Sequence, residues 1–291
     1  MKKNELISML NRDITDEHAA IIRYLVHGYL EGEDTPLGAG LLSRAREEMW
    51  HMHWLGMIIG QLGGGPDMKP GPYPFDPTNR ATIFKSYVEY EEKLIPHYKK
   101  EADMVDDPHI KRVLLREAWE SAMHATKFQR VINKLNPEQA STPPGSKNEL
   151  PMDFVDTLQD IVKAKYNEML QHLRNAWVFQ QEETVGWKIM DFAMTKMKQL
   201  AHDAEPIAEN GIVPKFKVEK IDLSTSIGLA LKKALEDVNS SRQHHETLRG
   251  SEEAQKHAGL MINLGLSIQQ ESYEAEEIEG WLSSQYIRDN E

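Results

Sequence analysis

Apolar residues recur every three or four positions along almost the whole chain, and runs that alternate apolar with polar residues are nearly absent. This spacing is typical of helices that turn one face toward a core. Thr35-Pro36 and Asp107-Pro108 each pair a capping residue with proline at the first helical position. The Gly-Gly-Gly-Pro segment at 63–66 ends a helix. The pattern predicts an all-α protein.

Each half of the chain contains four expected helices. Their ranges are 3–31, 36–62, 80–105 and 108–135 in the first half, and 152–181, 185–209, 223–248 and 252–287 in the second. A Pro/Gly-rich connection from Pro66 to Pro77 is long enough to carry the chain from one end of a bundle to the other. A second long connection runs through Pro214. Each half therefore has the helix order of a four-helix bundle with one crossover.

The segment 139–149, which contains Pro143-Pro144-Gly145, has the composition of a linker. It divides the sequence into a first expected domain at 1–138 and a second at 150–291. Because 291 residues with 40% hydrophobic content can supply two cores, we expect two four-helix bundles in tandem.

The two halves also match in register at two positions. A shift of 151 residues places Glu17 on Glu168 and His51 on His202. Because these positions come from different helices, the shared shift indicates that one half is a duplicate of the other.

Charge and cysteine content narrow the classes of function. With Lys+Arg 34 against Asp+Glu 46, the formal net charge of -12 repels nucleic-acid phosphates and anionic membranes, so neither is an expected partner. The chain has no cysteine, which excludes disulfides, iron–sulfur clusters and thiolate metal sites and leaves carboxylate and imidazole as ligands. No signal-like segment and no apolar run of ~18 residues occur, so we expect a cytoplasmic protein.

Charged residues interrupt the apolar face of each helix in the first half. Glu48 and His51 form an E-x-x-H on the second helix, with both side chains on the face that carries the apolar residues. An isolated carboxylate in a core costs several kcal/mol, so such groups persist when they are paired or bound to a cation. The residues concerned in the four helices are Glu17, Glu48, His51, Glu91, Glu117, Glu120 and His124. Their convergence predicts a site for two divalent ions.

With these residues the chain resembles the ferritin-like superfamily, especially its bacterioferritin and rubrerythrin branches. In that family, single glutamates on two helices and E-x-x-H on two others bind a pair of metal ions. The resemblance implies that Glu17, Glu48 with His51, and Glu91 are metal ligands. The fourth helix departs from the pattern, because it has Glu117, Glu120 and His124 but no E-x-x-H. Which of these three bind metal is left open.

The same resemblance implies two iron ions in the first domain, with manganese as the alternative. Bacterioferritins bind haem through a methionine next to the bridging glutamate, and Met49 occupies that place. A methionine on an apolar helix is usually a packing residue, so we expect no haem and no other organic cofactor. The tryptophans, among them Trp50, Trp54 and Trp119, are expected to fill the core, and His53, His97, His244 and His245 to serve packing or the surface.

The second half is expected to carry a degenerate site. Glu168, His202, Glu236, Glu271 and Glu274 are its inward candidates. Gln199 stands where the first half has Glu48, and an amide cannot serve as a charged bridging ligand. Lys165 lies three residues before Glu168, so an ion pair can take the place of a metal.

Three functions follow from these residues. The first is a di-metal oxidoreductase that reacts Fe(II) with O₂ or peroxide, as a ferroxidase or a peroxide scavenger. The second is a manganese catalase, and the third a non-catalytic scaffold of two bundles. The expected partners are metal ions, O₂ or peroxide, and further copies of the chain in a homo-oligomer. No individual catalytic residue is assigned.

Overall fold

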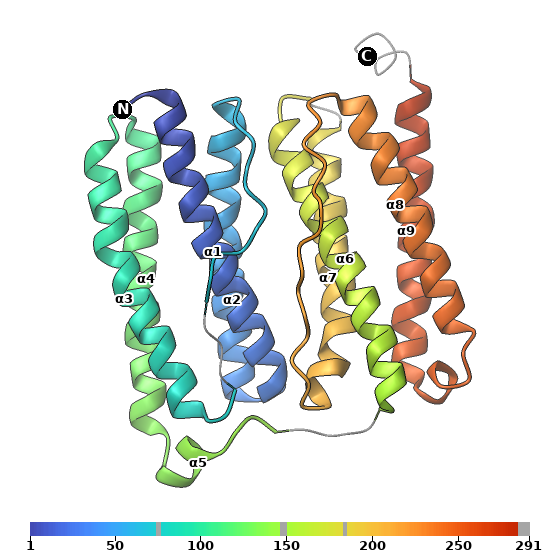
Figure 1. Cartoon of the computed structure of the whole chain (residues 1–291), viewed down its shortest axis with the longest axis horizontal. Coiled ribbons are helices and arrows are strands. Elements are labelled where there is room, and N and C mark those ends of the chain that lie inside the picture. The colour runs from blue at the N-terminus through green and yellow to red at the C-terminus, as the bar shows by residue number, and fades with distance from the viewer. Residues whose placement is uncertain (74–76, 146–149, 183–184, 285–291) are drawn as a thin grey trace. The chain divides into compact units, whose positions relative to one another are not determined.

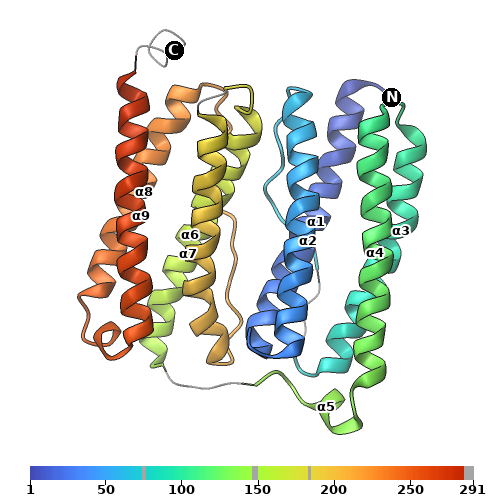
Figure 2. The same ribbon diagram turned by 180° about the vertical axis from the view of Figure 1, so that it is seen from behind.

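The computed structural model describes residues 1–73, 77–145, 150–182 and 185–284, and Figures 1 and 2 show it from opposite sides. All regular secondary structure within these ranges is helical. The expected all-α class is therefore confirmed. Within the same ranges no helix is both long and apolar enough to cross a membrane.

The chain divides into two compact units. Unit 1 consists of Met1–Leu62 and Lys69–Lys147, and unit 2 of Asn148–Glu291 with Gly63–Met68. Each unit is built from four long helices, as expected for two bundles in tandem. The limits 1–138 and 150–291 for separate domains stay a prediction.

Unit 1 contains the four long helices that the sequence predicts, within one residue at each end. They are α1 (Lys3–Glu31), α2 (Pro36–Gln61), α3 (Arg80–Met104) and α4 (Pro108–Lys134), followed by the short helix α5 (Pro137–Ser141). Helix α1 packs along α2, and α3 packs along α4 (Figure 1). Helix α3 starts at the end of the bundle opposite to the one where α2 stops (Figure 1).

The junction between α1 and α2 fixes how closely these two helices approach. Gly32 ends α1 with a φ of 87°, a backbone conformation that favours glycine. The Thr35 side chain then accepts a hydrogen bond from the Gly38 N–H at 3.0 Å and caps α2. A Cβ atom on Gly38 would lie 2.0 Å from the Gly32 carbonyl oxygen, so this approach requires glycine. The tight turn sets α1 and α2 side by side.

Unit 2 repeats the order of long helices. They are α6 (Met152–Val178), α7 (Gly186–Glu209), α8 (Ile227–Arg249) and α9 (Ala258–Ser283), with the 3₁₀ helix η1 (Ala254–Lys256) between the last two. The predicted ends at 181 and 248 lie within three residues of the observed ones. The predicted end at 287 lies outside the described residues.

The predicted starts of α8 and α9, at 223 and 252, are each several residues early. Residues 210–226 run along the bundle as an extended connection (Figure 2). Side chains of α6 hold it: the Asn167 amide donates to the Lys217 carbonyl oxygen at 2.9 Å, and the Gln171 amide donates to the Asp222 carbonyl oxygen at 3.1 Å. Because these bonds keep the backbone extended, α8 begins only where Ser226 caps it.

Two tryptophans lie outside the core of unit 1, contrary to prediction. Trp50 is 58% exposed and Trp119 is 74% exposed. Both follow the three-and-four spacing only in part, and each projects from the outer face of its helix. Tyrosine and phenylalanine fill the core instead: the Tyr24 ring meets the Tyr87 ring edge to face at a centroid distance of 4.9 Å and lies 5.2 Å from the Phe128 ring.

Candidate metal centre

Each of the four long helices of unit 1 places at least one ionisable side chain in the interior of the bundle. Six of the seven predicted ligands are buried, and they are Glu17, Glu48, His51, Glu91, Glu117 and His124. The seventh, Glu120, is partly exposed. The three-and-four periodicity of the helices accounts for this convergence, because it puts these residues on the face that also carries the apolar core.

One group of donor atoms joins α1 to α2. The His51 Nδ1 atom lies 2.8 Å from Glu48 Oε2 and 3.2 Å from Glu17 Oε2. One ligand atom from each of the three residues lies within 4.8 Å of the others, which is close enough for all to bind one ion.

A second group joins α2 to α3 and α4 through the same glutamate. The His124 Nδ1 atom lies 2.7 Å from Glu48 Oε1 and 3.3 Å from Glu91 Oε1. Glu48 therefore directs one carboxylate oxygen to each histidine. Within the second group, Glu48 Oε1 and His124 Nδ1 face each other, whereas Glu91 Oε2 is buried without a hydrogen-bond partner. An unpartnered carboxylate oxygen has lone pairs that can bind a cation.

The far side of each histidine is held by a glutamate from the opposite helix. His51 Nε2 lies 2.5 Å from Glu120 of α4, and His124 Nε2 lies 2.5 Å from Glu47 of α2. Arg116 donates to Glu120 at 2.9 Å, and Arg44 donates to Glu47 at 2.6 Å. A histidine whose outer nitrogen meets a carboxylate is oriented with its inner nitrogen toward a metal.

Sequence reasoning placed Glu120 with the ligands and passed over Glu47. The structure puts both at the outer nitrogen of a histidine. Their common signal is the spacing, because Glu47 precedes His51 by four residues as Glu120 precedes His124.

Two tyrosines hold the single glutamates of α1 and α3. The Tyr24 hydroxyl donates to Glu91 at 2.6 Å, and the Tyr98 hydroxyl donates to Glu17. Each tyrosine lies seven residues after the glutamate of its own helix and reaches the glutamate of the other helix. These bonds fix the carboxylates in place, while Glu17 Oε2 faces His51 and Glu91 Oε2 has no hydrogen-bond partner.

The buried carboxylate of helix α4, Glu117, lies one helical turn before the position at which an E-x-x-H motif ending at His124 would have its glutamate. Ser121, three residues before His124, occupies that place and is buried. Glu117 lies four residues earlier on the same face, and neither of its carboxylate oxygens has a hydrogen-bond partner. Burial raises the pKa of Glu117 well above its usual value, and the charges of Glu17 and Asp13 act in the same direction.

Charge in the centre is unbalanced without a cation. Burial, with the charge of Glu48, raises the pKa of Glu17 to about 8. Burial also raises the pKa of Glu91. Although burial opposes it, the carboxylate of Glu48 raises the pKa of His124 to about 12. Four buried carboxylates face two imidazoles, so the site must hold protons or metal ions.

The chain has no significant match in the comparisons with known proteins. No protein-family model matches it, and neither a curated protein nor a solved structure matches it. The metal-binding interpretation therefore rests on the side chains themselves.

Unit 2 fills the corresponding place with lysines. The Lys196 ammonium lies 3.0 Å from Glu168 Oε2 and 3.0 Å from Glu274 Oε2. Lys165 pairs with Glu271 and lies 3.4 Å from Glu168. All five side chains are buried. Among the described residues, the convergent metal-capable groups all belong to unit 1.

Two expectations for unit 2 are wrong. His202 and Glu236 are exposed, so neither faces the interior. Asp203, the next residue after His202, is buried instead. One residue rotates a helix by about 100°, so the 151-residue shift does not put equivalent environments together at this point. His245 is buried against Glu271, with His245 Nδ1 3.0 Å from Glu271 Oε2, and so belongs to the charged cluster.

The lysine cluster predicts how unit 2 responds to acid. Although burial opposes it, Lys165 and Lys196 lower the pKa of Glu168 to about 2. A carboxyl whose folded pKa is depressed stabilises the fold above its unfolded pKa of about 4.5, and this contribution is lost as the pH falls toward 2. We expect the urea-unfolding free energy of unit 2 to fall over this interval. Glu168→Gln should flatten that dependence, and an unchanged slope would contradict the assignment.

Proposed function

We propose that unit 1 is a dinuclear metal centre of the ferritin-like type that binds two iron ions and oxidises Fe(II) with O₂ or peroxide. The observation that carries the proposal is Glu48, whose two oxygens each meet a different histidine–carboxylate group. A shared carboxylate between two nitrogen- and oxygen-lined groups suits a pair of first-row divalent ions.

The donor set supports iron or manganese ahead of a structural zinc ion. Structural zinc sites are closed, tetrahedral and rich in cysteine, whereas this chain has no cysteine and offers carboxylates in excess of imidazoles. When bound, two iron ions supply one electron each, so that one H₂O₂ and two protons become two waters. The protein residues hold the pair, keep it away from bulk water and fix the ligand orientations.

The residues around the centre divide this work. In the proposal, Glu17, Glu48, His51, Glu91 and His124 bind the ions, and Glu117 supplies the carboxylate that Ser121 lacks. Glu47 and Glu120 orient the histidines from outside. The aromatic cluster of Tyr24, Tyr87 and Phe128 adjoins the centre, because Tyr24 donates to Glu91 and the Phe128 ring lies beside His124. A water-poor surrounding strengthens every charge interaction within it.

The test is metal content together with Fe(II) oxidation. Elemental analysis of protein purified without added metal should find at least about two ions per chain, and the identity of the metal separates iron from manganese. Anaerobic protein loaded with Fe(II) should then oxidise it on addition of O₂ or H₂O₂, followed by absorbance. Glu17→Ala should abolish oxidation, and the matched change Glu168→Ala in unit 2 should retain it. Oxidation that depends on Glu168 and survives without Glu17 would overturn the proposal, as would a chain that binds no metal.

The outer glutamates provide a finer prediction. Glu47→Gln and Glu120→Gln should each keep the number of bound ions but weaken affinity about 10- to 100-fold, because outer partners orient a ligand without binding the ion. Co²⁺ titration followed by visible absorbance measures this. The exposed Glu89→Gln on α3 is the matched control and should bind as the wild type does. Loss of a whole ion in Glu120→Gln would make Glu120 a ligand instead.

A further inference from the structure

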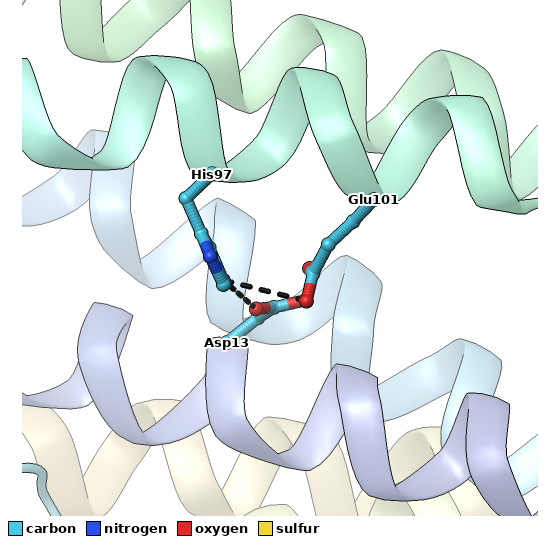
Figure 3. A group of neighbouring side chains, drawn as sticks. All are labelled: Asp13, His97 and Glu101. Carbon is cyan, nitrogen blue, oxygen red and sulfur yellow. Dashed lines mark hydrogen bonds and ion pairs between the residues drawn. The ribbon is translucent and has the colours of Figure 1, made fainter.

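Unit 1 contains a third group of possible metal ligands, separate from the two groups that contain Glu48. Asp13 of α1 and His97 and Glu101 of α3 converge, as Figure 3 shows. The His97 Nε2 atom lies 3.0 Å from Asp13 Oδ1 and 3.5 Å from Glu101 Oε1. We propose that these three side chains form a separate, mononuclear site for a divalent transition-metal ion.

Unsatisfied buried oxygens point to a ligand here. Asp13 is fully buried and Glu101 is 4% exposed, yet Asp13 Oδ2 and Glu101 Oε2 both lack a hydrogen-bond partner. Burying a carboxylate oxygen without a donor or a cation is costly. Because the two oxygens belong to side chains that converge on one histidine, a single ion satisfies both.

The protein's own cations balance this group only in part. Arg12 reaches Glu101 Oε1 at 3.4 Å, but its side chain is 60% exposed and it leaves Glu101 Oε2 without a partner. Burial and the charge of Asp13 raise the pKa of Glu101 to about 8. Two carboxylates with one imidazole form a nitrogen- and oxygen-lined set that suits Fe²⁺, Mn²⁺, Co²⁺ or Zn²⁺. The partial exposure of His97 leaves the site open to ions from solution.

The position of the site gives it a role in loading the centre. Asp13 lies one helical turn before Glu17 on α1, and the residue after His97 is Tyr98, which donates to Glu17. On α1, the carboxylates of Asp13 and Glu17 therefore lead from the open site to the buried one. This role rests on the proposed function, whereas binding at the third site does not.

The test counts Co²⁺ ions per chain by equilibrium dialysis and elemental analysis. The wild type should bind about three. His97→Gln, and independently Asp13→Asn, should lose one, and Glu89→Gln at an exposed position of α3 should lose none. Glu48→Gln should retain one ion, and adding His97→Gln to it should remove that ion. Circular dichroism of each variant checks that it is folded.

Each outcome separates the two proposals. A wild type that binds one ion and loses it in His97→Gln supports the third site and contradicts the dinuclear centre. An unchanged count in both His97→Gln and Asp13→Asn overturns the third site, and the group is then an ion-pair cluster only. For the loading role, stopped-flow absorbance should show slower Co²⁺ uptake at the buried pair in His97→Gln with the same final content. Uptake at the wild-type rate contradicts that role.

Discussion

Lys196→Met is expected to lower the free energy of unfolding by about 3–5 kcal/mol, because removing one partner of a buried ion pair leaves the other charge uncompensated. Lys196 is fully buried and lies 3.0 Å from a carboxylate oxygen of Glu168 and of Glu274. Methionine fills a similar volume, so the loss reports charge more than packing. Urea unfolding followed by circular dichroism measures it.

The neighbouring Lys198 supplies the control. It is exposed on the same helix, so Lys198→Met should change stability by no more than about 0.5 kcal/mol. Adding Glu274→Gln to Lys196→Met should recover part of the loss, because one uncompensated carboxylate is then neutral. If Lys196→Met were as stable as Lys198→Met, the ammonium would not be what balances these carboxylates.

Helix limits were predictable wherever a local signal fixes them. The cap at Thr35, the proline at Pro108 and the glycine run after α2 act within a few residues of the chain, and the predicted limits of unit 1 agree with the structure. The start of α8 was not predictable in this way. Residues before Ser226 are held extended by side chains from α6, some 50 residues away, and local periodicity carries no record of such contacts.

In the candidate site, too, the features set by local spacing were predictable, and those set by contacts between helices were not. Periodicity predicted that Glu17, Glu48, His51, Glu91, Glu117 and His124 would be inward, because the face of a helix follows from spacing. It could not predict which nitrogen of His51 faces Glu48 or that Glu120 meets the other one, since these depend on the rotation of α4 against α2. The absence of a glutamate at Ser121 could be predicted from the sequence, because the E-x-x-H motif requires a glutamate three residues before His124.

Lys196 is the clearest omission. It lies between Phe192 and Leu200 at four-residue steps, which is an apolar position occupied by a cation. Sequence reasoning singled out Lys165 and Gln199 and missed it. A lysine at an apolar helix position indicates a buried charge that needs an oppositely charged partner, just as a glutamate at such a position does. In unit 2 the ammonium groups of Lys165 and Lys196 balance the buried carboxylates. In unit 1 the buried carboxylates form groups that could hold a metal ion.

This contrast leads to the second large effect, a stability of unit 1 that depends on metal. An ion that binds only the folded state stabilises it by roughly 4 kcal/mol when its free concentration is 1,000 times its dissociation constant. We expect Co²⁺ to raise the unfolding free energy of unit 1 by at least this amount, and to leave the urea transition of unit 2 unchanged because its carboxylates are already paired with Lys165 and Lys196.

Glu48→Gln should abolish most of this gain. Glu48 belongs both to the group that contains His51 and to the group that contains His124, so its loss affects both. Glu91→Gln removes a ligand from one group only and should retain part of the gain, while the exposed Glu89→Gln on the same helix should retain all of it. Urea unfolding with and without Co²⁺, compared across the three variants, measures the order. Equal losses in Glu48→Gln and Glu91→Gln would mean that the two ions bind only together, and full retention in Glu48→Gln would mean that Glu48 does not bridge them.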